Sequence, residues 1–164
     1  MRSLANSVQQ TSGTLDHSWR AILECAAVEV FEMMAGVRLE VDPAPAEHPS
    51  GEQTAMVGIA GALCGMITLR CSEQTSLKLA SLMLGGDRPP THTTACDALG
   101  ELCNMVAGNF KSKINALKDR CMLSVPTVIT GEDYAMEAAD PNQGFTVALT
   151  FDGEPVWVCL IAHT

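Results

Sequence analysis

The amino-acid sequence predicts an α/β (α+β) fold in which a mainly antiparallel sheet is packed by long helices, as a pseudo-twofold repeat of one helix-plus-strands unit. Two segments carry the apolar period of amphipathic helices, and each is followed by about three runs with strand character. An offset of 72 residues aligns E-V-F-E-M-M-A-G, from Glu29, with E-L-C-N-M-V-A-G, from Glu101. Two copies are too few for a solenoid, which favours a pseudo-twofold domain.

The first half of the chain is predicted to hold two helices and a hairpin. The first helix follows Asp16 as N-cap and ends at Gly36, with a short strand over 37–41 and a Pro-rich loop behind it. A hairpin over 54–70 turns near Gly61, and Ser72 then caps a helix that ends at Gly85-Gly86. The apolar stripe of the first helix comprises Trp19, Ile22, Leu23, Ala26, Val30, Phe31 and Met34.

The second half opens with the most strongly patterned helix. Thr94-Ala-Cys-Asp97 resembles a capping box, and the helix should run to about Leu117. A strand interrupted by Pro126 follows, then a loop over 132–143 and a hairpin turning at Asp152-Gly153. That turn pairs Phe145, Val147 and Leu149 with Leu160, Val158 and Val156 on the core side. The other face of this hairpin is too apolar to be solvated, which predicts a covering helix or a second subunit: Thr146, Ala148, Trp157, Cys159, Ile161.

Length and charge limit the domain organisation and the partners. With 164 residues, 47% of them apolar, we expect one domain over 15–164 behind a flexible lead-in at 1–14. Nineteen acidic against ten basic residues give a net charge of -9, which opposes binding to nucleic acid or to an anionic membrane. We therefore expect neither of these partners.

Cysteine usage and hydropathy predict a cytoplasmic, soluble protein. Seven cysteines without a C-x-x-C pair fit neither a disulfide framework nor a zinc knuckle, whereas reduced thiols fit the cytoplasm. The N-terminal residues lack the apolar stretch of a secretory signal. The longest uncharged run, Ala55 to Leu69, is too short and too Gly-rich to span a membrane.

The central helix carries an unusual stripe opposite its apolar face. Asp97, Glu101, Asn104 and Gly108 are spaced so that neighbouring members can touch. A solvated helix face ordinarily holds good helix formers, but Asp, Asn and Gly are poor ones. Gly108 would let the backbone of a partner come close. From spacing alone, an ordinary solvated face remains the more frequent interpretation.

The residues of this stripe carry a family resemblance. The segment D-A-L-G-E-L-C-N-M-V-A-G-N-F-K-S-K, with S-V-P-T-V-I-T-G after it, resembles the CheC/CheX/FliY family of chemotaxis phosphatases. The mark of that family is Asp or Ser, three residues, Glu, two residues and Asn, with a Pro further on; here these are Asp97, Glu101, Asn104 and Pro126. The stretches G-I-A-G-A-L-C-G-M-I-T-L and E-V-F-E-M-M-A-G extend the resemblance over about residues 16–162.

The resemblance implies dephosphorylation of the aspartyl phosphate of a CheY-type response regulator in chemotaxis signalling. By position, Glu101 would be the docking carboxylate that pairs with a Lys of the regulator, and Asn104 would orient the attacking water. Asp97 and Gly108 would contact the partner with Glu101. Because an acyl phosphate is already activated, its hydrolysis needs an in-line water and charge neutralisation more than a covalent nucleophile. Mg²⁺ would belong to the regulator, so we expect no metal or cofactor in this chain.

The same residues bear on the first helix, on the oligomeric state and on two alternative functions. The first helix has Cys25, Glu29 and Glu32 at the motif positions, so we interpret that copy as inactive. A single site resembles the CheX-like branch of the family, whose members tend to be homodimers. A non-catalytic regulator-binding or flagellar-switch-like module on the same fold is the second function in play. A Cys-based hydrolase would need a low-pKa thiol near a His, and nothing in the sequence places any His beside a Cys.

Overall fold

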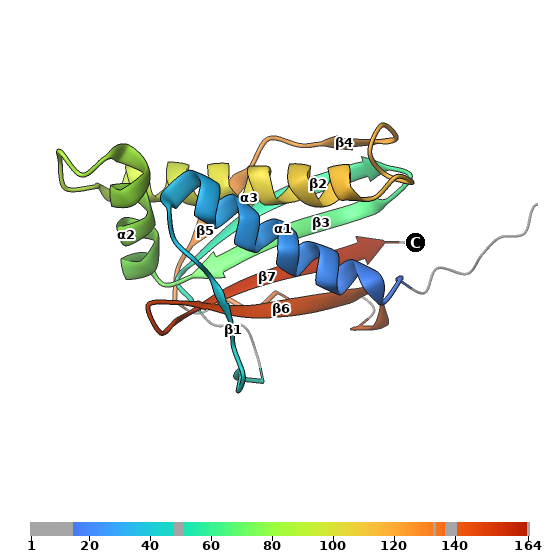
Figure 1. The fold of residues 1–164 in the computed structure, drawn as a ribbon, viewed down its shortest axis with the longest axis horizontal. Helices are drawn as coiled ribbons and strands as arrows, with labels where there is room; N and C mark the ends of the chain where they lie inside the picture. The colour runs from blue at the N-terminus through green and yellow to red at the C-terminus, as the bar shows by residue number, and fades with distance from the viewer. Residues whose placement is uncertain (1–14, 48–50, 133, 137–140, 164) are drawn as a thin grey trace, which may run out of the picture.

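The computed structural model describes residues 15–47, 51–132, 134–136 and 141–163. Within them, three helices lie on one face of a seven-stranded sheet (Figure 1). None of the described helices is long and apolar enough to cross a membrane. The predicted lead-in at 1–14 lies outside the described residues.

Helices α1 and α2 follow the predicted boundaries closely. Helix α1 spans Ser18–Ala35 and ends at Gly36, whose φ of 67° is left-handed. Its N-cap position is His17 rather than Asp16, although the Asp16 carboxylate accepts a hydrogen bond from the Ser18 N–H at 2.8 Å. Helix α2 spans Glu73–Leu84, is capped by the Ser72 hydroxyl and ends at left-handed Gly85.

Helix α3 spans His92–Lys113, so both predicted ends were misplaced. The capping box is formed by Thr91 and Thr94, which puts Asp97 in the second turn, where it cannot cap its own helix. At the other end the backbone leaves the helix at Ile114, but Ile114 and Leu117 stay buried through short turns. Apolar periodicity reports burial, and here burial continues beyond the helical hydrogen bonds.

All the strand pairs of the described sheet are antiparallel, in the order β1-β6-β7-β3-β2-β4, with β5 also pairing β2. The predicted strand over 37–41 is reduced to the two residues of β1, and a short 3-10 helix at Pro141–Gln143 precedes β6. The strands are β1 Glu40–Val41, β2 Gln53–Gly61, β3 Cys64–Cys71, β4 Cys121–Leu123, β5 Thr127–Thr130, β6 Gly144–Phe151 and β7 Glu154–His163.

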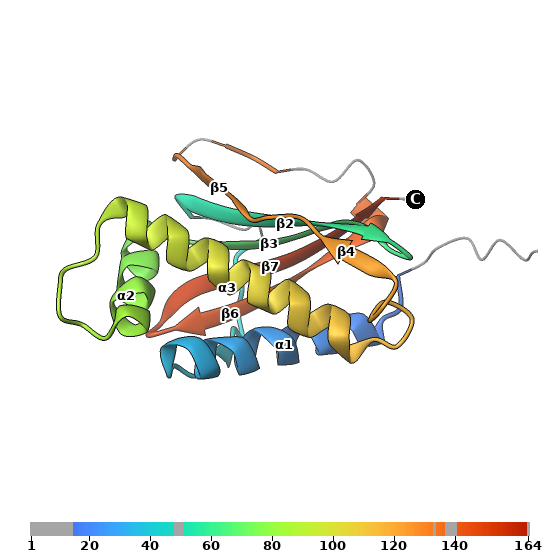
Figure 2. The same cartoon turned by 90° about the horizontal axis from the view of Figure 1, so that it is seen from above.

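The strand order has the predicted pseudo-twofold form. One unit runs α1, β1, β2, β3, and the other runs α3, β4 and β5, β6, β7. Exchanging the two units reverses the strand order onto itself, with β3 and β7 paired at the centre. The short edge strands are swapped, because β1 pairs with β6 of the other unit and β4 with β2. Helices α1 and α3 lie on the same face of this sheet (Figure 2).

The predicted hairpin registers are confirmed. Val147 pairs with Val158 and Leu149 with Val156 on the core face, and Phe145 pairs with Leu160. The β2–β3 hairpin turns after Gly61, where φ is 135° and an added Cβ would collide with the Arg120 carbonyl. Glycine is required at that turn because the backbone of the 114–120 segment passes close by.

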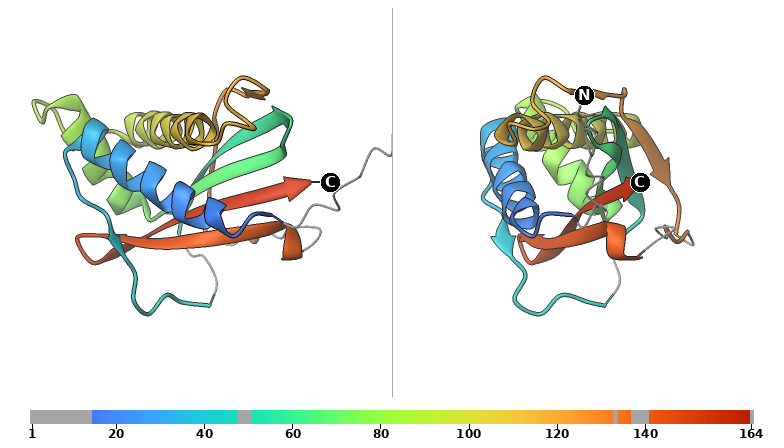
Figure 3. Two further views of the ribbon diagram at one scale, coloured as in Figure 1. Left: turned by 45° about the vertical axis from the view of Figure 1, so that its right-hand side comes forward. Right: turned by 90° about the vertical axis from the view of Figure 1, so that its right-hand side faces the viewer.

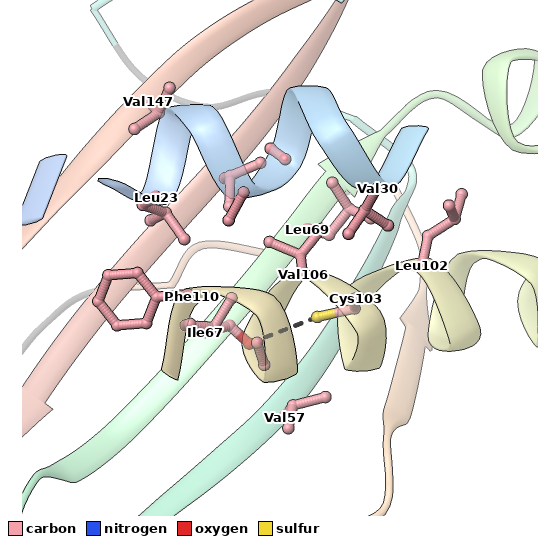
Figure 4. Packing of buried hydrophobic residues seen from close by; sticks show 14 of the residues in the cluster. Leu23, Val30, Val57, Ile67, Leu69, Leu102, Cys103, Val106, Phe110 and Val147 are labelled. Carbon is pink, nitrogen blue, oxygen red and sulfur yellow. Dashed lines mark hydrogen bonds between the residues drawn. The ribbon is translucent and has the colours of Figure 1, made fainter. Parts of the chain in front are cut away.

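The core lies between the two long helices and the sheet (Figure 4). Phe110 is fully buried and meets Trp19 edge-on, with ring centroids 6.1 Å apart. The buried Cys103 thiol donates to the carbonyls of Ala55 and Ile67, both at 3.6 Å, and burial raises its pKa to about 12. Cys103 is therefore a core residue of α3, in agreement with its position on the apolar face of that helix.

No described helix covers the outer face of the sheet (Figure 3). Of the two coverings expected for this face of the C-terminal hairpin, the helix was therefore wrong. Instead, Tyr134 lies against this face. Its ring is 4.6 Å from the Arg70 guanidinium, and its hydroxyl is hydrogen-bonded to Thr54 at 2.6 Å. Trp157 is 4% exposed, while Cys159 and Ile161 are half-buried. The prediction of a second subunit stays a prediction.

Candidate functional site

The predicted stripe lies on the side of α3 that faces away from the core. Asp97 and Glu101 are exposed, and Asn104 and Gly108 are half-buried. The core face of the same helix is occupied by Leu99, Leu102, Cys103, Val106 and Phe110. The structure therefore brings the four predicted site residues together along one accessible face of one rigid helix.

Residues 122–128 form a wall beside this stripe; they comprise the end of β4, the connection to β5 and the start of β5. A Cβ atom placed on Gly100 would lie 3.5 Å from the Pro126 Cβ, and one placed on Gly108 would lie 4.0 Å from Leu123 Cδ1. Because positions 100, 104 and 108 share one side of a helix, Asn104 lies between these two contacts. Asn104 is thus half-buried near the junction of helix and wall.

The wall is held in place by the neighbouring strand. The Ser124 hydroxyl accepts a hydrogen bond from the Gly58 N–H at 2.8 Å, and the Ser124 N–H donates to the Gly58 carbonyl at 2.9 Å. Pro126 adds a fixed φ at the point where the wall meets Gly100. Pro126 therefore packs against α3 close to the stripe.

Two large apolar residues of the wall are exposed, which sequence reasoning did not predict. Met122 is 78% exposed and Val125 is 82% exposed, next in the chain to the wall residues Leu123 and Pro126. Large exposed apolar side chains are a feature of protein-docking surfaces. The sequence signal that could have indicated their exposure is that Met122 and Val125 each directly precede a residue that packs on α3.

The equivalent positions on α1 are arranged differently. The Glu29 carboxylate accepts hydrogen bonds from Lys113 Nζ, Asn109 Nδ2 and the Cys25 thiol, at 2.8, 2.9 and 3.3 Å. These bonds, that of Lys113 first, lower the pKa of Glu29 to about 2. The carboxylate of the first-helix copy is therefore engaged in joining α1 to α3, and Glu32 supplies no amide.

One statement of the sequence analysis was wrong: the structure does place a His beside a Cys. His92 Nε2 is 3.6 Å from the Cys96 sulfur, and His92 Nδ1 is 2.7 Å from Glu73 Oε1. Burial first, and then the negative charges of Asp97 and Glu73, raise the pKa of the Cys96 thiol. A reactive cysteine needs the opposite shift, so this arrangement does not favour a thiol nucleophile.

The described residues contain no group of three or more His, Cys, Asp or Glu side chains placed to hold a metal ion. Cys103 is buried in the core, away from His92 and Cys96 on the surface of the same helix.

A curated relative, the CheY-P phosphatase CheX of Thermotoga maritima, is 33% identical over 84 residues, which is 51% of this chain and 54% of the relative. The chain thus matches about half the length of that protein.

Solved structures show the same fold over most of the chain. The chemotaxis protein CheX of Desulfovibrio desulfuricans aligns with a TM-score of 0.76 at 21% identity, covering 89% of this chain and 99% of that one. The CheX of a CheX–CheY–BeF3–Mg²⁺ complex from Borrelia burgdorferi aligns with a TM-score of 0.71 at 21% identity, covering 89% and 98%. The family model described as chemotaxis phosphatase CheX matches residues 53–150, which is more than half of the sequence. The chain therefore belongs to the CheX family of chemotaxis phosphatases.

Proposed function

We propose that this protein dephosphorylates the aspartyl phosphate of a CheY-type response regulator. The observation that carries the proposal is the placement of Glu101 and Asn104 on the accessible side of α3, with the amide at the junction with the 122–128 wall. Family membership, a relative named as a CheY-P phosphatase and a neighbour solved in complex with CheY support the same class of partner.

Asn104 is assigned to the attacking water. A carboxamide both accepts and donates hydrogen bonds, so it can hold a water while remaining uncharged near the phosphoryl oxygens. The water oxygen attacks phosphorus, the bond from phosphorus to the aspartyl oxygen breaks, and the regulator keeps the carboxylate while inorganic phosphate leaves. Water positioning of this kind lowers the barrier by orientation, without a covalent intermediate on this chain.

Glu101 is assigned to docking. It lies one turn before Asn104 and is exposed, so its carboxylate can pair with a Lys of the regulator while the amide enters the active site. Asp97 and Gly108 extend the contact along the same face. Mg²⁺ stays with the regulator in this proposal, and the chain contributes no cofactor. A homodimer would leave the stripe on each chain as a separate site.

The test is the decay of a phosphorylated CheY-type regulator from the same genome, with this protein in turn as wild type, Asn104→Ala and Asn109→Ala. Asn109 is the matched control, because it makes the same chemical change on α3 but bonds Glu29 on α1. We expect Asn104→Ala to lose at least about tenfold in kcat/KM with its unfolding midpoint unchanged, and Asn109→Ala to keep its activity. Equal activity in wild type and Asn104→Ala would refute the assignment.

Glu101→Ala separates docking from chemistry. Loss of a charged pair should raise KM or the Kd for the regulator more than it lowers kcat, by about tenfold. If instead the wild-type protein binds the regulator without changing its decay, the chain is a non-catalytic interaction module on the same fold.

A further inference from the structure

A second surface feature lies at the N-terminal end of α3, beyond the stripe. A pocket of about 250 Å³ is lined by side chains from α2, α3 and the paired ends of β2 and β5: Glu52, Gln53, Glu73, His92, Thr130, Gly131 and Glu132. A neighbouring pocket of about 410 Å³ shares Glu52 and Glu132 and adds Glu154. The lining residues of the two pockets include four glutamates and neither Lys nor Arg.

Gln53 is the feature that points to a ligand. Its side chain is 1% exposed, and both its Oε1 and its Nε2 are buried with no hydrogen-bond partner. The alternation of β2 places Gln53 on the same face as the buried Ala55 and Val57, on the side of the sheet that carries the helices. An unpaired buried amide is costly, so a polar partner for Gln53 is expected in the pocket that it lines.

The remaining acceptors of the pocket are carboxylate oxygens. Glu52 Oε2 accepts the Glu73 N–H at 2.9 Å, and Glu73 Oε1 contacts His92 at 2.7 Å, so one oxygen of each carboxylate is already used. These bonds fix both carboxylates and leave their second oxygens available. The described residues hold no metal-binding group of three, and an organic cation with several N–H donors suits this distribution of acceptors better than a metal ion.

We infer that the two pockets bind a linear polyamine. One ammonium group would lie between Gln53 Oε1, Glu73 and Glu132, and a second would lie toward Glu154 in the neighbouring pocket, with the alkyl chain between them. Glu52 and Glu132 line both pockets, so the two pockets are adjacent. A lysine side chain of a protein partner presents the same alkylammonium chemistry at one of the two positions only.

The test is calorimetric titration of the purified chain with spermidine at about 0.15 M salt, where non-specific attraction to an acidic protein is screened. The variants are Gln53→Met, Glu132→Gln and the charge-matched control Asp119→Asn, which lies in the 114–120 segment at the opposite end of α3. We expect Gln53→Met and Glu132→Gln each to weaken spermidine binding about tenfold, and Asp119→Asn to leave it unchanged.

Four outcomes would overturn the proposal. Equal weakening in all three variants would show attraction to net charge, and unchanged binding in Gln53→Met would separate the amide from the ligand. If spermidine does not bind but Gln53→Met weakens binding of the regulator, the ammonium group is a partner lysine. Mg²⁺ displacing spermidine at equal concentration would identify a metal site. If Gln53→Met does not fold, the Glu132→Gln variant, which changes an exposed residue, tests the proposal in its place. None of these measurements depends on phosphatase activity.

Discussion

Gly108→Ala separates the requirements of the fold from those of the proposed docking surface. Gly108 is half-buried at the C-terminal end of the accessible stripe of α3 and has ordinary helical geometry. An added Cβ would approach nothing closer than Leu123 Cδ1, at 4.0 Å. The fold therefore has room for a methyl group at this position. A regulator backbone packed closely against the stripe, however, would collide with that methyl group.

The expected effect on stability follows from helix propensity. Alanine is favoured over glycine by about 1 kcal/mol in a helix interior, so the free energy of unfolding should rise by that amount. For a chain of this size the melting temperature should rise by about 3 °C. Gly100→Ala is the matched control, because Gly100 lies where the 122–128 wall covers the same helix, and its Cβ would be in ordinary contact 3.5 Å from Pro126 and Val128.

The assay is urea unfolding of both variants together with regulator dephosphorylation. Both should be more stable than wild type, but only Gly108→Ala should lose kcat/KM, by about tenfold, because one interfacial methyl prevents close approach. Wild-type activity in Gly108→Ala would refute the partner-contact role of Gly108. A loss of stability in Gly108→Ala would instead refute the estimate of free space beside Leu123.

Three further perturbations test other parts of the structure. The folded-state pKa of Glu29 is lowered to about 2, so the stabilisation that its carboxylate provides should disappear as the pH falls from about 4.5 to 2. Urea unfolding at several pH values should show this loss of stability in the wild type but not in Glu29→Gln. Gly61→Ala should cost at least about 2 kcal/mol in thermal unfolding, since its φ is 135° and its Cβ would collide with the Arg120 carbonyl; unchanged stability would contradict this geometry. Val125→Asp should change stability by less than about 0.5 kcal/mol but weaken regulator binding in calorimetry, and unaltered affinity would remove Val125 from the docking surface.

The parts of the fold that could be predicted from sequence are those fixed by local chemistry. Asp152-Gly153 sets the register of β6 with β7, and Asp152 does adopt a positive φ of 51°. Ser72 and Gly85 likewise mark the ends of α2 because each supplies a cap. The accessible stripe of α3 was predictable for a similar reason, because its apolar face assigns the opposite face to solvent.

Most of the features that sequence did not predict depend on contacts between distant segments. His92 and Cys96 have the i, i+4 spacing of neighbours on a helix, and their contact was missed because the helix was predicted to begin at Thr94 rather than at His92. The contact of His92 with Glu73, by contrast, arises only because α2 and α3 pack together. Similarly, Gln53 has the spacing of an ordinary strand residue, and only the fold shows that its amide is buried without a partner. Tyr134 comes from a stretch predicted as a loop, yet it lies against the outer face of the sheet.

The two units of the pseudo-twofold share an architecture, but their motif carboxylates have different environments. Glu29 and Glu101 occupy equivalent positions of the repeat, on helices that lie on the same face of the sheet. Lys113, at the end of α3, reaches across to Glu29 at 2.8 Å, whereas no described residue forms an ion pair with Glu101. A carboxylate already neutralised by an internal lysine has less to gain from a partner lysine. Of the two motif carboxylates, Glu101 is therefore the one that suits the proposed docking role. Two differences thus assign the proposed site to α3 alone. The first-helix copy has Glu32 where α3 has Asn104, and its Glu29 is already paired with Lys113.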